Sequence, residues 1–411
     1  MTPRRSFLLG LIVIGAVASG PGLILLGVLA LLADALSTLW STRGLDRTSY
    51  ERRIDHERAV WGDAVPMELT ARNAKALPLP WFRVDDYASE ELTVRERPLI
   101  PSDRPGRGIL RTTWTMGPFQ RATRLVHLVA DRRGVFDLGP VRLSVADVFG
   151  RDAAMVEHPA RGTFLVRPRS VPVRAAEGWR EPQGTRRARS HALIEDPTLY
   201  AGVRPYQRGD SPRRLHHRAT ARSTRPLSKR FDPSTVRTIV VVLDVQTQDG
   251  PSWLLAYDED LLESLVVATA SLCRQFLAAG AAVGLAANGW SRSLARTIFV
   301  APQPGPRHLT AVSDSLARLS LTASTTFAHL LATLPMRVTP GALLVLVSSQ
   351  DPANVAVPAR RLAAAGYELR LVCIGPRADE WRSRAVRLGI TASIGRLEPD
   401  WRTSTVLEPV G

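Results

Sequence analysis

The chain has 411 residues, enough for two or three domains, and its apolar fraction of 45% suits folded cores. A net charge of +16 and an isoelectric point near 11.1 invite a nucleic-acid interpretation. However, only Lys75 and Lys229 of the 54 basic residues are lysine, and the arginines are spread along the chain. This composition is typical of a GC-rich coding bias, and we expect no nucleic-acid partner. The two cysteines, Cys273 and Cys373, lie in apolar patterns, which excludes a disulfide framework.

The N-terminal segment is apolar. Residues 7–32 carry no charge and are interrupted only by the Ser-Gly-Pro-Gly at 19–22. The run is too long for the apolar centre of a secretory signal, so we predict a membrane anchor over residues 1–45. Two topologies remain open. One is a single kinked helix of about 39 Å, and the other is a helical hairpin whose first arm has about 15 residues, or about 22 Å.

Basic residues flank this segment on both sides, with Arg4 and Arg5 before it and Arg43 and Arg47 after it. Because positive flanks stay in the cytoplasm, the pattern favours the hairpin. We therefore expect a multi-pass protein of the cell membrane with cytoplasmic soluble domains. Trp40 and Tyr50 are then expected to be interfacial anchors.

Residues 50–168 change from a continuous apolar pattern to an alternating one. Short apolar-polar runs bounded by Gly, Pro and Asn predict a small antiparallel β-sandwich. The turn aspartate Asp147 is expected to make local hydrogen bonds rather than to be catalytic. The expected strands are 67–72, 81–84, 110–115, 122–130, 140–146 and 163–166, with a turn at 131–134.

Residues 169–235 form a basic linker in this interpretation, because apolar periodicity is lost there. The stretch from Arg180 to Arg230 holds 13 basic residues against four acids.

Residues 236–411 alternate between apolar strand patterns and amphipathic helix patterns, which predicts an α/β domain with a buried parallel sheet. The expected strands are 239–245, 282–287, 342–347 and 368–374, the last of these being the final strand. The expected helices are 254–279, 307–319, 326–334 and 358–365.

The segment from Arg204 to Arg222, RPYQRGDSPRRLHHRATAR, packs six arginines, two histidines and one acid into 19 residues. It resembles the motif of the bacterial domain of unknown function 58 family, which is membrane-anchored and ends in a von Willebrand A-like domain. Residues 134–143 and the turn at 147–150 resemble the hairpin of that family. The family's histidine is followed by tryptophan, where this chain has His217. The motif residues are Arg204, Tyr206, Gly209, Asp210, Arg213, Arg214, His216 and Arg222.

Asp244 ends the first strand of the α/β domain, at the sheet edge where such sheets bind ligands. In von Willebrand A-like domains this turn reads Asp-x-Ser-x-Ser and binds a divalent ion. Here Gln246 and Gln248 replace both serines, and Ser349 lies where the later aspartate would be. Thr325 could supply the threonine ligand. The resemblance thus implies a degenerate Mg²⁺ site at Asp244, Gln246, Gln248, Thr325 and Ser349, weighed against an aspartate that caps backbone amides.

Three roles compete for the Arg204–Arg222 segment: a structural strap held by Arg–carboxylate pairs, a docking surface for an acidic partner, and a nucleic-acid contact. His216 and His217 have no matching nucleophile in any known order, and no phosphate-binding loop or metalloprotease motif occurs. We therefore expect no enzyme. The resemblance implies a membrane-anchored adaptor for a MoxR-type AAA+ ATPase, acting in the assembly or maturation of protein complexes. A divalent-metal-dependent adhesion module and a membrane-tethered nucleic-acid binder are the alternatives.

Overall fold

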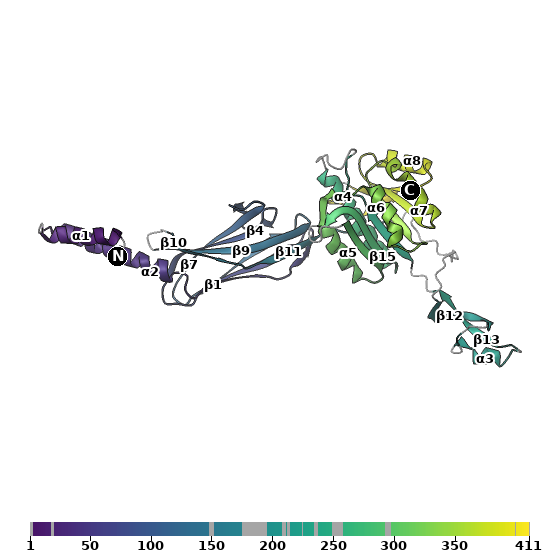
Figure 1. Cartoon of the computed structure of the whole chain (residues 1–411), viewed down its shortest axis with the longest axis horizontal. Coiled ribbons are helices and arrows are strands. Elements are labelled where there is room, and N and C mark those ends of the chain that lie inside the picture. Colours follow the sequence, from purple (N-terminus) through teal and green to yellow (C-terminus); the bar gives the residue numbers. More distant parts are fainter. Residues whose placement is uncertain are drawn as a thin grey trace. The chain divides into compact units, whose positions relative to one another are not determined.

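The computed structural model describes residues 3–17, 20–147, 152–174, 195–207, 211, 214–223, 225–233, 237–248, 258–291, 297–398 and 400–410. It divides into two compact units, Met1–Pro168 and Arg169–Gly411. Figure 1 gives the element labels used below.

Unit 1 begins with two apolar helices, α1 (Pro3–Val17) and α2 (Pro21–Arg43). They pack against each other, and a Cβ on Gly27 would lie only 2.4 Å from the Ile12 side chain. The two helices therefore pack as a pair within unit 1, and α1 has 15 residues. In the described part of the chain, two helices are long and apolar enough to cross a membrane, α2 and α4 (Glu259–Ala278). Since α4 is largely buried inside unit 2, it is a core helix.

The rest of unit 1 consists of strands in two mainly antiparallel sheets. The first sheet has the order β1-β3-β8-β5 and the second the order β2-β11-β9-β4-β7-β6, with β10 also paired to β9. The strand bounds are β1 Thr48–Ile54, β2 Arg58–Val60, β3 Ala64–Asn73, β4 Leu79–Ser89, β5 Thr93–Val94, β6 Ile100–Pro101, β7 Arg107–Met116, β8 Arg121–Val129, β9 Gly134–Ala146, β10 Asp152–His158 and β11 Gly162–Arg167.

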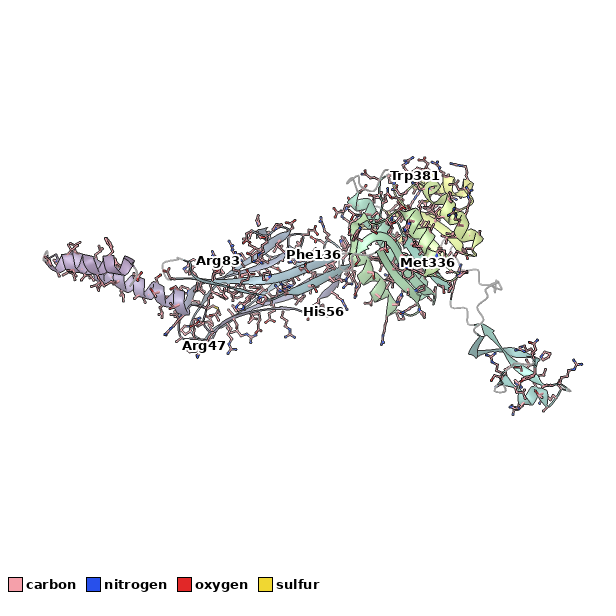
Figure 2. The ribbon with its side chains drawn as sticks, viewed as in Figure 1. Arg47, His56, Arg83, Phe136, Met336 and Trp381 are labelled. Carbon is pink, nitrogen blue, oxygen red and sulfur yellow. The ribbon has the colours of Figure 1, made fainter. Side chains whose placement is uncertain are left out.

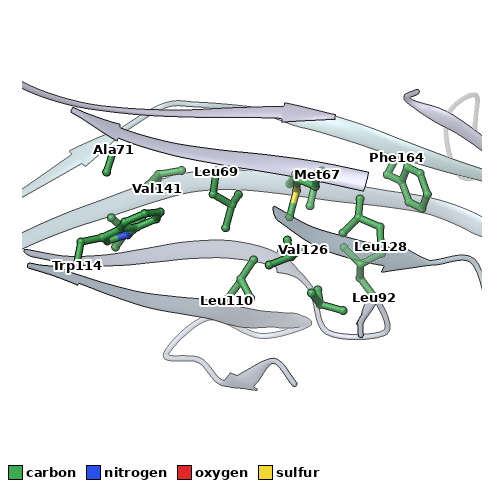
Figure 3. Close-up of a cluster of buried hydrophobic side chains, with 14 of the residues drawn as sticks. Met67, Leu69, Ala71, Leu92, Leu110, Trp114, Val126, Leu128, Val141 and Phe164 are labelled. Atoms are coloured by element: carbon green, nitrogen blue, oxygen red, sulfur yellow. The ribbon is translucent and has the colours of Figure 1, made fainter. Parts of the chain in front are cut away.

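One hydrophobic core lies between these two sheets (Figure 3). The alternating side chains Met67, Leu69 and Ala71 of β3 face it from the first sheet, and Leu110 and Trp114 of β7 face it from the second. A buried ion pair also bridges the sheets, because Arg52 of β1 binds Asp86 of β4. The hydroxyl of Tyr50 donates to the same carboxylate at 3.2 Å. Burial raises the pKa of Asp86, and Arg52 opposes that rise.

The expected interfacial positions of Trp40 and Tyr50 are wrong. The Trp40 ring is 6% exposed and belongs to the core of unit 1, where its Nε1 donates to the carbonyl of Pro78 at 3.0 Å. Tyr50 packs against the same core. Both aromatic side chains are thus satisfied inside the protein, because the last turns of α2 dock directly on the β-sheet body. Asp147 is fully buried and accepts a hydrogen bond from Ser37 of α2 at 2.6 Å.

Unit 2 contains a sheet with the order β16-β15-β14-β18-β19-β20-β21. Neighbouring strands from β15 to β20 are parallel, whereas β16, β17 and β21 pair antiparallel at the margins. The strand bounds are β14 Thr238–Leu243, β15 Ala282–Ser291, β16 Thr297–Gln303, β17 Leu319–Ala323, β18 Leu343–Ser348, β19 Glu368–Cys373, β20 Thr391–Leu397 and β21 Leu407–Val410.

Helices cover this sheet on both faces (Figure 1). Val240 and Val242 of β14 share a core with α6 (Phe327–Thr333), α7 (Ala356–Ala364) and α8 (Ala378–Arg387). The other face is covered by α4, which packs with α5 (His308–Ala317). Cys273 of α4 and Cys373 of β19 are both free and buried. The expected buried parallel sheet is therefore present.

The end of the chain differs from the expectation that 368–374 is the final strand. Helix α8 and strands β20 and β21 follow it. The α8 sequence ADEWRSRAVR is highly charged, and only Ala378, Trp381 and Ala385 are buried. The helix packs on the sheet through one narrow apolar stripe only. Its sequence therefore has fewer apolar residues than the segments that were predicted as helices, and it was not predicted.

A separate small element in unit 2 carries the basic segment. Strands β12 (Glu195–Pro205) and β13 (Leu227–Pro233) pair antiparallel, and the short helix α3 (His217–Thr220) connects to β13. The residues around 200 were expected to be linker. They form a strand here because β13 supplies the backbone partners that local sequence does not reveal.

Candidate functional site

Asp244 follows β14 immediately, and Ser348 ends the neighbouring parallel strand β18. The chain leaves β14 toward β15 on one side and leaves β18 toward β19 on the other. In open α/β sheets this crevice between diverging connections is where ligands bind. The polar residues at this edge are therefore the candidate functional site.

The carboxylate of Asp244 is enclosed by hydrogen-bond donors. Oδ1 accepts from the side-chain amide of Asn288 at 2.8 Å and from the backbone amide of Gln246 at 3.2 Å. Oδ2 accepts from the hydroxyl of Ser348 at 3.0 Å. The Asp244 residue is 2% exposed. These three donors, from β15, the β14 turn and β18, join three strands at one carboxylate.

A second layer of bonds fixes those donors. Asn288 Oδ1 accepts from the amide of Val245 at 2.8 Å, so both ends of its side chain are used. The Ser348 hydroxyl accepts from the amide of Gln350 at 3.0 Å. The carbonyl of Gln246 accepts from Ser349 Oγ at 3.2 Å and from Gln350 Nε2 at 3.0 Å. The turn after β14 is thus tied to the turn after β18.

Burial raises the pKa of the Asp244 carboxyl to about 6, and the bonds from Asn288, Gln246 and Ser348 oppose that rise. The charged form is costly here because the carboxylate is buried, and among the described residues no cationic side chain bonds to it to offset that cost.

These residues do not fit a divalent ion. Asp244 Oδ1 already faces two N–H donors, whose hydrogens lie where a cation would have to bind. The side-chain amide of Gln246 donates to the carbonyl of Gln248 at 3.3 Å, and Ser349 is engaged with the Gln246 carbonyl. Within the described residues, no cluster of three or more His, Cys, Asp or Glu side chains could hold a metal. The arrangement is that of a capping aspartate.

Thr325 lies in the loop before α6, next to Ser324. Ser324 binds the Asn288 carbonyl through its amide at 2.7 Å and its hydroxyl at 2.8 Å. The loop that carries Thr325 is therefore joined to the site through Asn288, the residue that the sequence interpretation missed. The sequence does contain a feature that could have identified Asn288, because this amide side chain directly follows the apolar run Ala282–Ala287.

The Arg204–Arg222 segment lies on the β12–β13 element. Arg204 is on β12 opposite Ser228, and the amide of Tyr206 donates to Pro226 at 2.9 Å. Arg214 is half-buried, and Arg222 is exposed just after α3. The remaining motif residues, Gly209, Asp210 and Arg213, lie outside the described residues.

His216 has a structural role in this element. Its Nδ1 accepts from the amide of Ala219 at 3.0 Å, which caps α3, and its own amide donates to Leu227 at 2.8 Å. His217, by contrast, is exposed. The two adjacent histidines therefore differ in environment.

Comparison with known proteins finds a family whose sequence profile matches this region. Residues 202–372 match the sequence profile of the family described as "Protein of unknown function DUF58". The match confirms the resemblance drawn from the Arg204–Arg222 segment. The "Uncharacterized protein YeaD" of Bacillus subtilis (strain 168) is 24% identical over 244 residues, which are 59% of this chain and 56% of that protein. The chain thus matches little more than half the length of this relative.

Solved structures resemble smaller parts. The CARDB domain of the PF1109 protein from Pyrococcus furiosus is 14% identical over 29% of this chain and 91% of that domain, with a TM-score of 0.20. A beta-glucosidase from Listeria innocua is 12% identical over 29% of this chain and 16% of that enzyme, with a TM-score of 0.18. Scores this low carry neither fold nor function over to this chain.

Proposed function

We propose that the protein is a membrane-anchored, non-enzymatic adaptor whose C-terminal unit is a degenerate von Willebrand A-like domain. The hydrogen-bonded enclosure of Asp244 is the observation that supports this proposal. A buried carboxylate that accepts from Asn288, Gln246 and Ser348 has three of its roughly four acceptor positions occupied, so it is poorly placed to activate a substrate or hold an ion.

The topology of unit 2 also supports the domain assignment. Numbered from β14, its main strands follow the order 3-2-1-4-5-6 of doubly wound sheets. The enclosed Asp244 lies at the crevice between strands 1 and 4. The turns after β14 and β18 are bonded to each other through Ser349 and Gln350, and such a fixed polar edge suits contact with a protein surface better than chemistry on a small molecule.

The membrane anchor is proposed from the two N-terminal helices, as a hairpin with the soluble units in the cytoplasm. Apolar side chains of α2 such as Leu25, Leu29 and Leu32 are each more than half exposed. An exposed apolar surface on consecutive helical turns fits lipid and is unfavourable in water.

The partner proposed from the family resemblance is a MoxR-type AAA+ ATPase, docked on the edge around Asp244 and on the arginines of the Arg204–Arg222 segment. The test is capture of the purified ATPase by the full chain in detergent. Arg213→Glu with Arg214→Glu should reduce capture at least about tenfold, as expected for loss of buried charge contacts at an interface. A matched control is Arg360→Glu with Arg361→Glu, an exposed arginine pair on α7.

Equal capture by the wild type and both variants would remove the segment from the interface, and absence of capture by the wild type would refute this partner. Calorimetry with Mg²⁺ addresses the metal-dependent alternative. Heat of binding that Asp244→Asn abolishes would refute the degenerate-site assignment.

A further inference from the structure

Two residues with a strained backbone lie at one end of unit 1, on either side of the turn after β3. Among the described residues, Arg47 (φ 48°) and Phe119 (φ 53°) are the non-glycine positions with positive φ. Such a backbone is unusual for a bulky side chain and costs free energy. The turn after β3 lies between them: the amide of Ala74 donates to the Arg47 carbonyl at 2.9 Å, and the amide of Phe119 donates to the Lys75 carbonyl at 3.1 Å.

The fold does not require an arginine or a phenylalanine side chain at these two positions. Phe119 is 72% exposed, and Arg47 is exposed as well. Glycine or asparagine would adopt the same backbone with less strain. Strain that is kept while the side chain stays in solvent indicates a role for that side chain outside the fold.

Positive charge gathers at the same end. Arg72 and Arg121 face each other directly across β3 and β8, and both are exposed. Like charges in this position destabilise a sheet. Arg43 and Arg47 add two more exposed guanidinium groups. Within the described residues, no ion pair is formed by these four, whereas Arg104 and Arg142 farther along the unit bind Glu157 and Asp103.

This end of unit 1 is also the one joined to the apolar helices. Trp40 of α2 bonds to Pro78 in the turn after β3, and Asn73 Nδ2 ties that turn to Gly117 in the Phe119 turn at 2.9 Å. Only residues 44–47 separate α2 from β1. Figure 2 shows Arg47 at the α2 end of the unit and His56 toward its other end. If the helices enter a bilayer, the arginines and Phe119 must lie close to its surface.

We infer that Arg43, Arg47, Arg72, Arg121 and Phe119 form a lipid-contact surface that binds the headgroups of anionic phospholipids. The arginines pair with lipid phosphates, and the Phe119 ring inserts at the headgroup boundary. The surface rests on the membrane anchoring proposed above and goes beyond it, since it fixes how the β-sheet body meets the membrane and which lipids it prefers.

The experiment uses the full chain in nanodiscs made of phosphatidylcholine alone or of phosphatidylcholine with phosphatidylglycerol. An environment-sensitive fluorophore is attached at Phe119→Cys, or at His56→Cys as the matched control at the opposite end. The native cysteines are buried and free, so they contribute little labelling to the folded chain. We expect a blue shift and at least about twofold less quenching by aqueous iodide at position 119 in the anionic discs, weakened by added salt. Position 56 should not change.

Arg72→Gln with Arg121→Gln should remove the lipid dependence at position 119 while the chain stays in the disc. An unshifted fluorophore at position 119, or the same shift in both lipid compositions, would overturn the inference while leaving the anchor intact. Failure of the chain to co-elute with either disc would refute the anchor and this surface together.

Discussion

The side-chain amide of Asn288 lies 2.8 Å from the carboxylate of Asp244, deep between β15 and β14. Because Asn288 also accepts from the amide of Val245, the pair closes the turn at the sheet edge and leaves the carboxylate without a free acceptor direction on that side. Asn288 of β15 thereby holds the turn after β14 in place.

Asp244→Asn should remove a pH-dependent part of the stability of unit 2. The folded pKa of about 6 is above the ordinary value of 3.8, so the folded chain holds a proton that the unfolded chain loses as the pH rises from about 4 to about 6. The free energy of unfolding should therefore fall over this range, by up to about 3 kcal/mol, and stay low above it. The variant has no such step, and near pH 7.5 it should be at least as stable as the wild type.

Labelling of Cys273 and Cys373 measures this, because both thiols are buried in unit 2 and become reactive when that unit unfolds. The measurement is made in urea with a disulfide reagent active in acid. Glu398→Gln, which changes an exposed carboxyl of the same unit, is the control. Parallel pH profiles of the wild type and Asp244→Asn would contradict the prediction.

Sequence patterns predicted the strands of both units where apolar residues were dense, as in β14 and β18. They could not place Asn288, because its role depends on β15 lying next to β14, and pairing between strands is not local information. Asp244 was found since it ends an apolar strand. Whether Asp244 binds a metal ion or caps a turn depends on its neighbours Asn288 and Ser348. These lie 44 and 104 residues farther along the chain.

For Trp40, the sequence pattern led to the wrong environment. An aromatic residue near the end of an apolar helix has the same local pattern whether it faces lipid or a protein core. Only the docking of α2 on the turn that holds Pro78 distinguishes the two, and that contact spans 38 residues.

Arg52→Met should destabilise unit 1 by about 3–5 kcal/mol, because it leaves the Asp86 carboxylate buried without its cation. Replacing both residues, as in Arg52→Met with Asp86→Leu, should restore much of that loss. Urea unfolding followed by tryptophan fluorescence measures the change, while cysteine labelling confirms that unit 2 is unaffected. Arg104→Met removes a partly exposed pair with Glu157 and should cost less than about 1 kcal/mol. If the two single variants cost the same, the buried pair is not the bridge between sheets that we describe.

His216→Ala should loosen the β12–β13 element by about 1 kcal/mol, since the amide of Ala219 loses its cap. Hydrogen exchange of the Ala219 and Leu227 amides should then be about fivefold faster. His217→Ala changes the exposed neighbour and should leave both rates unaltered. Equal effects of the two variants would mean that the imidazole of His216 does not hold α3.

Phe119→Asn should raise the free energy of unfolding of unit 1 by about 1 kcal/mol, because asparagine adopts positive φ more easily than phenylalanine and little apolar contact is lost from a ring that is 72% exposed. Arg47→Asn should act in the same direction for the same reason. Urea unfolding of the full chain in neutral detergent measures both variants without anionic lipid. A control is Leu125→Asn, which changes an exposed apolar residue on β8 with ordinary backbone and should give no gain. A loss of stability in Phe119→Asn would show that the ring supports the fold, and the strain at this end would then need no ligand to explain it.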